Sequence, residues 1–164
     1  MIKTYDNFLN TKKCSFIKNQ IENNLFGQKD PQILSIKREL SELLNTSLEL
    51  QTGPFVISNI EINKDQNLFE FEKEGILKSK TAVIYLNDDY EGGNIYFKHH
   101  RFYAEPKTGK LLVFDRLSEE FWKFVGQERF YRMGWDPTMN YTILPVIKGK
   151  RFLLIIDFLD ESTQ

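Results

Sequence analysis

The apolar residues of this chain change their spacing at Gly53 and Pro54, and this change restricts the fold more than any other feature of the sequence. Before that point they recur every three or four positions, as on the buried face of a helix. After it they form short runs separated by turn residues, as in strands. Helices followed by many short strands predict an α+β protein whose core is a barrel or a two-sheet jelly roll.

The first predicted helix covers residues 11–26, with Asn10 or Thr11 as its N-cap. Gly27 follows its last residue, where a glycine commonly ends a helix. The buried face consists of apolar residues at four-residue spacing, namely Ile17, Ile21 and Leu25.

A second helix is predicted in residues 30–45, where Asp30 is the cap and Pro31 takes the first helical position. Proline is tolerated there because the first N–H groups of a helix have no partner within the helix. The buried stripe consists of Ile33, Ile36, Leu40, Leu43 and Leu44. We expect residues 1–52 to form a helical support for the β core.

Seven segments are predicted as strands, in residues 55–62, 67–74, 81–87, 94–97, 101–105, 110–115 and 151–159. We expect one domain, with residues 53–164 as its β core and a partly helical insertion in about 115–141. Aromatic residues in this insertion either cover the core or form a recognition patch for a protein or peptide. They are Phe121, Trp122, Phe124, Phe130, Tyr131 and Trp135.

The overall composition argues against several classes of protein. The 164 residues fit one domain, and the formal net charge is −1, so we expect neither nucleic acid nor membrane as a partner. The single cysteine, Cys14, cannot form an internal disulfide, and the first ten residues lack the apolar run of a signal peptide. We therefore expect a cytoplasmic or otherwise intracellular protein that is not secreted.

The stretch "YLNDDYEGG", residues 85–93, resembles the strand–turn–strand motif of prolyl 4-hydroxylase-like oxygenases, which use iron(II) and 2-oxoglutarate. Four more segments resemble the same family in the same order, in residues 5–14, 44–62, 105–114 and 145–152. The resemblance implies a double-stranded β-helix with helices packed on one side. In that fold, Gly92 and Gly93 are expected to give the backbone freedom and close approach at the mouth of the barrel.

The resemblance also implies where a metal would be held, because the family binds iron(II) through two histidines and one carboxylate. The distal histidine of the family falls ten residues before its basic residue, which here is Arg151. This chain has Tyr141 at that position. Glu70 and Glu72 replace the proximal pair if the register is kept with an acid in each place. The resemblance therefore implies a degenerate metal site.

A shift by one residue places Phe71 and Lys73 at the proximal positions instead, where they bind no metal. His99 and His100 are adjacent, so on a strand they point to opposite faces, and we expect exposed turn residues. The oxygen donors of the two glutamates and Tyr141 suit magnesium, calcium or manganese better than iron(II). Tyr141 is either such a ligand or an aromatic that fills the space of the lost metal and histidine.

The resemblance assigns the binding of 2-oxoglutarate to Arg151, whose guanidinium fork suits the far carboxylate of this acid. Thr81 and Tyr85 lie on one strand at an even spacing, so their hydroxyls face the same side and can assist the same carboxylate. The alternative is an arginine at the edge of the sheet that reaches solvent or pairs with Asp115.

The sequence is compatible with three functions, and it assigns no catalytic residue. The first is an oxygenase-like protein that has lost its iron triad and acts as a binding or structural module. The second is an active iron(II)/2-oxoglutarate dioxygenase that hydroxylates a protein or peptide side chain through atypical ligands. The third is a barrel that binds an organic acid at Arg151 without redox chemistry.

Overall fold

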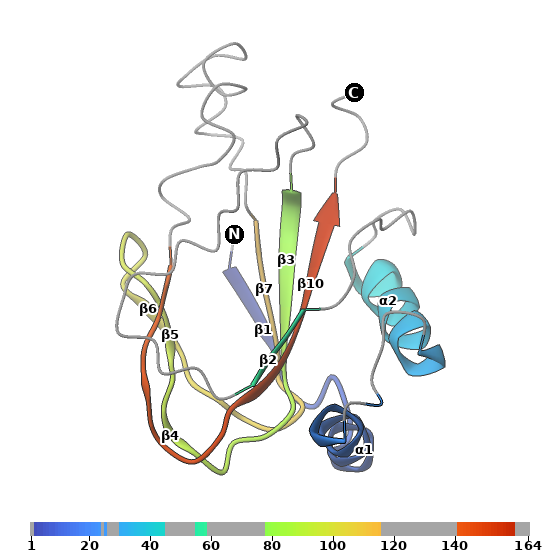
Figure 1. Cartoon of the computed structure of the whole chain (residues 1–164). Helices are drawn as coiled ribbons and strands as arrows, with labels where there is room; N and C mark the ends of the chain where they lie inside the picture. Colours follow the sequence, from blue (N-terminus) through green and yellow to red (C-terminus); the bar gives the residue numbers. More distant parts are fainter. Residues whose placement is uncertain are drawn as a thin grey trace, which may run out of the picture.

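The computed structural model describes residues 2–23, 25, 30–44, 55–58, 78–115 and 141–159. The predicted strand in residues 67–74 and most of the predicted insertion, residues 116–140, lie outside these ranges. Helices and antiparallel sheets are packed together, with both helices on one side (Figure 1). No helix in the described ranges is long and apolar enough to cross a membrane.

Helix α1 spans Thr11–Glu22 and begins at a predicted position. The Asn10 side chain accepts a hydrogen bond from the backbone N–H of Lys13 at 2.8 Å, so Asn10 is the N-cap rather than Thr11. The helix ends earlier than predicted. Leu25 therefore lies beyond it and is 68% exposed, so the prediction that Leu25 belongs to the buried face is wrong.

Helix α2 spans Pro31–Leu44 and starts at the predicted residue. Asp30 Oδ1 accepts a hydrogen bond from the backbone N–H of Gln32 at 2.9 Å, which caps the first turn. The predicted stripe is buried or partly buried at Ile33, Ile36, Leu40 and Leu44. Leu43 is 43% exposed, contrary to the prediction, because it lies at the edge of this stripe.

The largest sheet has five antiparallel strands in the order β1-β7-β3-β10-β2. The strands are Ile2–Tyr5 (β1), Leu111–Asp115 (β7), Lys78–Tyr85 (β3), Phe152–Leu159 (β10) and Phe55–Ser58 (β2). Strand β1 is absent from the sequence prediction, and its Ile2 lies opposite Phe114 of β7. We expected residues 1–52 to form only helical support. This region also contributes an edge strand to the core.

Two smaller antiparallel sheets complete the described fold. Their strands are β4 (Glu91–Gly92) with β9 (Val146–Lys148), and β6 (Phe102–Ala104), β5 (Ile95–Phe97) and β8 (Thr142–Ile143) in that order. Strands β5 and β6 lie on one side of the five-stranded sheet and the helices on the other (Figure 1). Among the described elements, the helices, the five-stranded sheet and the sheet that contains β5 and β6 therefore form three layers.

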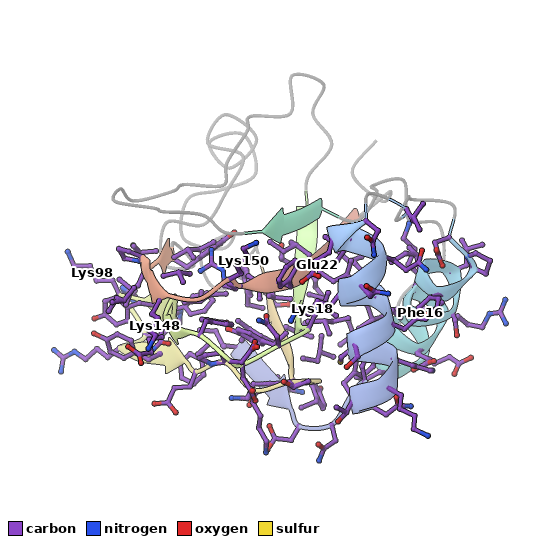
Figure 2. The ribbon with its side chains drawn as sticks, turned by 60° about the horizontal axis from the view of Figure 1, so that its bottom comes forward. Phe16, Lys18, Glu22, Lys98, Lys148 and Lys150 are labelled. Carbon is purple, nitrogen blue, oxygen red and sulfur yellow. The ribbon has the colours of Figure 1, made fainter. Side chains whose placement is uncertain are left out.

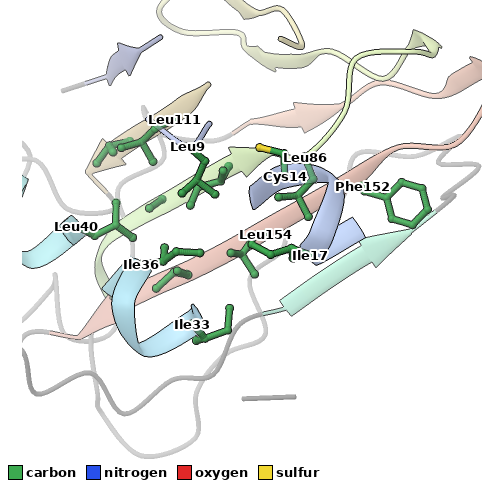
Figure 3. Close-up of a cluster of buried hydrophobic side chains, with 14 residues drawn as sticks. Leu9, Cys14, Ile17, Ile33, Ile36, Leu40, Leu86, Leu111, Phe152 and Leu154 are labelled. Atoms are coloured by element: carbon green, nitrogen blue, oxygen red, sulfur yellow. The ribbon is translucent and has the colours of Figure 1, made fainter. Parts of the chain in front are cut away.

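The alternation along β3 divides the interior into two cores. Ala82 and Ile84 belong to the cluster that also contains Ile17 and Ile36 of the two helices. Figure 3 shows this cluster. Val83 and Tyr85 point the other way, into a cluster between the sheets. Because both faces of the central strands are buried, their sequences read as nearly continuous apolar runs.

Candidate ligand-binding site

Arg151 lies directly before β10, and its side chain is fully buried. Alternate residues of an extended chain face the same side, and Leu153 and Ile155 belong to the cluster between the sheets. Arg151 therefore points into that space. The alternative of an edge arginine that reaches solvent is therefore wrong. Asp115, the other partner considered, forms an ion pair with Lys80.

The neighbouring basic residues of the same turn have a different environment. Lys148 and Lys150 are exposed, and Figure 2 shows them at the outer surface of the molecule. Arg151 is thus the one cation of the "KGKR" segment that the fold takes out of water. Burying a charge is costly unless it is paired, so the position of Arg151 calls for a partner.

Asn87, from the "YLN" motif, holds the backbone on both sides of Arg151. Its Nδ2 donates to the carbonyl oxygen of Lys150 at 2.7 Å, and its Oδ1 accepts from the N–H of Phe152 at 2.8 Å. Nδ2 also donates to Asp89 Oδ1 at 2.6 Å, and this hydrogen bond lowers the pKa of the Asp89 carboxyl. The motif alone predicted no role for Asn87.

Only one nitrogen of the Arg151 fork has a protein partner in the described ranges. Nη1 donates to the carbonyl oxygen of Gly93 at 3.1 Å. Nε and Nη2 are buried and have no hydrogen-bond partner among the described residues. These two nitrogens form one edge of the guanidinium plane and offer parallel N–H bonds, the arrangement that binds a carboxylate in a bidentate manner.

Gly92 and Gly93 lie where a larger side chain would meet neighbouring atoms. A Cβ on Gly93, where φ is +72°, would lie 3.2 Å from Arg151 Nη1 and 3.1 Å from Tyr90 Cε2. A Cβ on Gly92, where φ is +76°, would overlap the carbonyl oxygen of Pro145. The expectation of backbone freedom and close approach at Gly92 and Gly93 is therefore confirmed.

Thr81 and Tyr85 lie on the predicted common face of β3, and both are buried. Tyr85 is opposite Leu153, near Arg151, and its hydroxyl donates to the carbonyl oxygen of Ala104 at 3.4 Å. Burial raises the pKa of the Tyr85 hydroxyl well above its ordinary value, so it stays protonated. Thr81 lies four residues before Tyr85 on the same strand, about 13 Å away at the rise of a strand. Their assistance to a bound carboxylate stays a prediction.

Tyr90 is a candidate site residue that the sequence analysis did not single out. It is 8% exposed, and its hydroxyl is buried without a hydrogen-bond partner in the part of the chain that the structure describes. Its ring edge lies against Gly93, and a Cβ on Gly149 would lie 3.0 Å from Tyr90 Cβ. Two turns with glycines at their contacts therefore enclose Tyr90 beside Arg151. A tyrosine inside a motif that is otherwise acidic and glycine-rich was the available signal.

Tyr141, which the resemblance of the motifs aligns with the distal histidine, belongs to an aromatic cluster between the sheets. It is 6% exposed, and its ring centroid lies 5.0 Å from that of Phe114 and 5.6 Å from that of Phe97. These contacts agree with the predicted alternative in which the Tyr141 ring fills the space of a lost metal and histidine. Whether Tyr141 also binds a metal stays a prediction.

The structure does not test the other two predicted metal ligands. Glu70 and Glu72 lie outside those ranges. No group of three or more His, Cys, Asp or Glu side chains gathers among the residues that the structure describes. His99 and His100 are exposed in the turn between β5 and β6, with ring centroids 5.3 Å apart, as expected of turn residues.

No family model and no curated protein matches this sequence. Solved structures match it along nearly its whole length. The viral collagen prolyl hydroxylase of Paramecium bursaria Chlorella virus-1, in its 2OG complex, has 16% identity and a TM-score of 0.69, with 96% of this chain and 94% of that chain covered. A truncated form of the same enzyme gives 16% identity, coverage of 96% and 88%, and a TM-score of 0.68.

A bacterial enzyme gives a similar result. The prolyl-4-hydroxylase of Pseudomonas putida has 16% identity and a TM-score of 0.59, with 98% of this chain and 88% of that chain covered. At this identity the likeness establishes a shared fold. The chain therefore has the fold of viral and bacterial prolyl hydroxylases, in agreement with the resemblance of its motifs.

Proposed function

We propose that this chain is a prolyl 4-hydroxylase-like protein with a double-stranded β-helix core, which has lost the iron triad and binds an organic acid at Arg151. The observation that carries the proposal is the fully buried fork of Arg151 with Nε and Nη2 unpartnered among the described residues. A buried cation in that state is strongly unfavourable, and a carboxylate that accepts from both nitrogens removes the penalty.

The far carboxylate of 2-oxoglutarate fits the donor set. Its two oxygens match the parallel N–H bonds of the fork, and the buried position strengthens a charge-assisted hydrogen bond. Tyr85 lies on the face of β3 near Arg151 and is the nearer of the two predicted hydroxyl residues to a carboxylate bound there, because Thr81 is four residues away on the same face. The viral neighbour was solved as a 2OG complex, which supports the same class of ligand for this fold.

The loss of iron is proposed from the donor chemistry. Neutral imidazoles hold iron(II) in the family, whereas the resemblance of the motifs aligns the distal imidazole with Tyr141. The Tyr141 phenol packs in an aromatic cluster. When bound, iron(II) would supply the oxygen activation of the family. Arg151 needs no metal to hold a carboxylate, so ligand binding and redox chemistry are separable in this protein.

A thermal-shift series in a chelating buffer tests the proposal. We expect 2-oxoglutarate to raise the melting temperature, because a ligand at 100 times its dissociation constant stabilises the folded state by about 2.7 kcal/mol. 2-Oxopentanoate, which lacks the far carboxylate, is the matched control and should give no shift. Arg151→Met should abolish the shift, and Arg151→Lys should reduce it because the fork is lost.

Two outcomes would overturn the proposal. Equal melting-temperature shifts with both acids would mean that Arg151 does not bind the far carboxylate. Stabilisation only after addition of iron(II), with succinate released from 2-oxoglutarate, would favour the alternative of an active dioxygenase that acts on a protein or peptide side chain.

A further inference from the structure

Tyr90 adds a third buried polar atom without a hydrogen-bond partner among the described residues, and its ring lies beside the guanidinium group of Arg151. We propose that Tyr90 is a specificity residue whose hydroxyl donates to the same carboxylate that Nε and Nη2 of Arg151 hold. This inference rests on the proposed function and deepens it, because it defines the ligand class as acids with a planar, fully ionised terminal carboxylate.

The contacts around Gly93 place the two residues together. One point, the position of a Cβ on Gly93, lies 3.1 Å from Tyr90 Cε2 and 3.2 Å from Arg151 Nη1. The phenol ring and the guanidinium group therefore flank the same glycine. The two groups also interact electrostatically, since the guanidinium counteracts the effect of burial on the pKa of Tyr90.

Burial and hydrogen bonding separate Tyr90 from the other phenol near the fork. The Tyr85 hydroxyl donates to the carbonyl oxygen of Ala104. The Tyr90 hydroxyl is also buried, yet it has no partner among the described residues. A buried hydroxyl without a partner costs free energy, so a bound acceptor at this point would stabilise the folded protein.

Three donors match one carboxylate. Its two oxygens offer about four acceptor sites, so the fork uses two and a third remains for a phenol. Burial raises the pKa of the Tyr90 hydroxyl far above neutrality, so the group carries its proton and acts as a donor. This set of three donors favours an ionised carboxylate over an amide. The NH₂ of an amide is itself a donor and would face Nε, Nη2 or the Tyr90 hydroxyl without an acceptor.

Calorimetric titration of 2-oxoglutarate into the full chain with EDTA present tests the role of Tyr90. We expect Tyr90→Phe to weaken binding about tenfold or more, the range of a lost hydrogen bond to a charged group. Tyr103→Phe, at an exposed phenol, is the matched control and should bind like the wild type. Tyr90→Phe should melt at or above the wild-type temperature without ligand, because it removes an unpartnered hydroxyl.

The outcomes separate this inference from the proposed function. If the wild type does not bind 2-oxoglutarate, both fall. If the wild type binds and Arg151→Met does not, while Tyr90→Phe binds as tightly as the wild type, only the role of Tyr90 is refuted. A marked loss of ligand-free stability in Tyr90→Phe would also refute it, because the hydroxyl would then have a partner within the protein.

Discussion

The carbonyl oxygen of Gly93 accepts a hydrogen bond from Arg151 Nη1 at 3.1 Å and so joins two motifs that lie 58 positions apart in the chain. One motif is the glycine turn after "YLN", and the other is the basic turn before β10. The contact fixes one side of the guanidinium plane and leaves the opposite edge facing away from the glycine. The residues that make the site therefore also explain why both motifs occur together.

Gly93→Ala should destabilise the protein by about 1–3 kcal/mol, because its φ of +72° is strained for alanine and the added Cβ meets Tyr90 and Arg151. Denaturant unfolding with and without 2-oxoglutarate measures both effects, and we expect ligand binding to be impaired as well. Asn94→Ala, at the next position, is the control and should change stability little. Equal effects of the two substitutions would contradict the close packing described at Gly93.

Asn87→Ala should cost about 2–3 kcal/mol, because it leaves the carbonyl of Lys150 and the N–H of Phe152 without their buried partner. Asn87→Asp keeps an acceptor for Phe152 but loses the donor to Lys150 and places a second carboxylate beside Asp89. It should also be destabilised. Chemical denaturation measures the change. A wild-type midpoint for Asn87→Ala would show that the hydrogen bonds of Asn87 to Lys150 and Phe152 are dispensable for stability.

Arg151→Met should leave the ligand-free protein as stable as the wild type or more stable, by about 1–4 kcal/mol, because replacing a buried charge with an apolar side chain commonly does so. The reason is the unpartnered edge of the guanidinium group, which the thioether chain replaces without polar atoms. Unfolding midpoints in dialysed, ligand-free protein give the result. A loss of several kcal/mol would mean that the protein itself pairs the fork.

Alkaline pH should destabilise the protein. Burial raises the pKa of Tyr85 and Tyr90 above their ordinary value of 10.0, so the folded state keeps both protonated while the unfolded chain ionises them. The unfolded state then binds fewer protons, and the stability falls as pH rises above 10. Melting temperatures between pH 8 and 11 should fall less steeply for Tyr85→Phe and Tyr90→Phe. Equal slopes in the wild type and both variants would contradict this prediction.

The long, strongly patterned elements were predictable from the sequence. Pro31 and Asp30 gave the start of α2 because cap chemistry is local, and the apolar run that follows Arg151 gave β10 because both its faces are buried. Strand β1, by contrast, has only four residues with no apolar alternation of its own. It becomes a strand by pairing with β7, a long-range contact that no local pattern encodes.

The candidate site was predictable in part for the same reason. The resemblance of the motifs singled out Arg151, and alternation placed Tyr85 and Thr81 on one face. Tyr90 escaped prediction because its burial comes from the packing of one turn on another, at Gly93 and Gly149. The proximal positions Glu70 and Glu72 lie outside the described residues, so their assignment stays a prediction.

The central claim is that the carboxylate anchor is retained without the iron centre. Isothermal titration of 2-oxoglutarate, once with EDTA and once anaerobically with iron(II), tests it most directly. The account predicts one binding site with the same dissociation constant under both conditions. Binding that appears or tightens strongly only with iron(II), followed by release of succinate when oxygen is admitted, would contradict it.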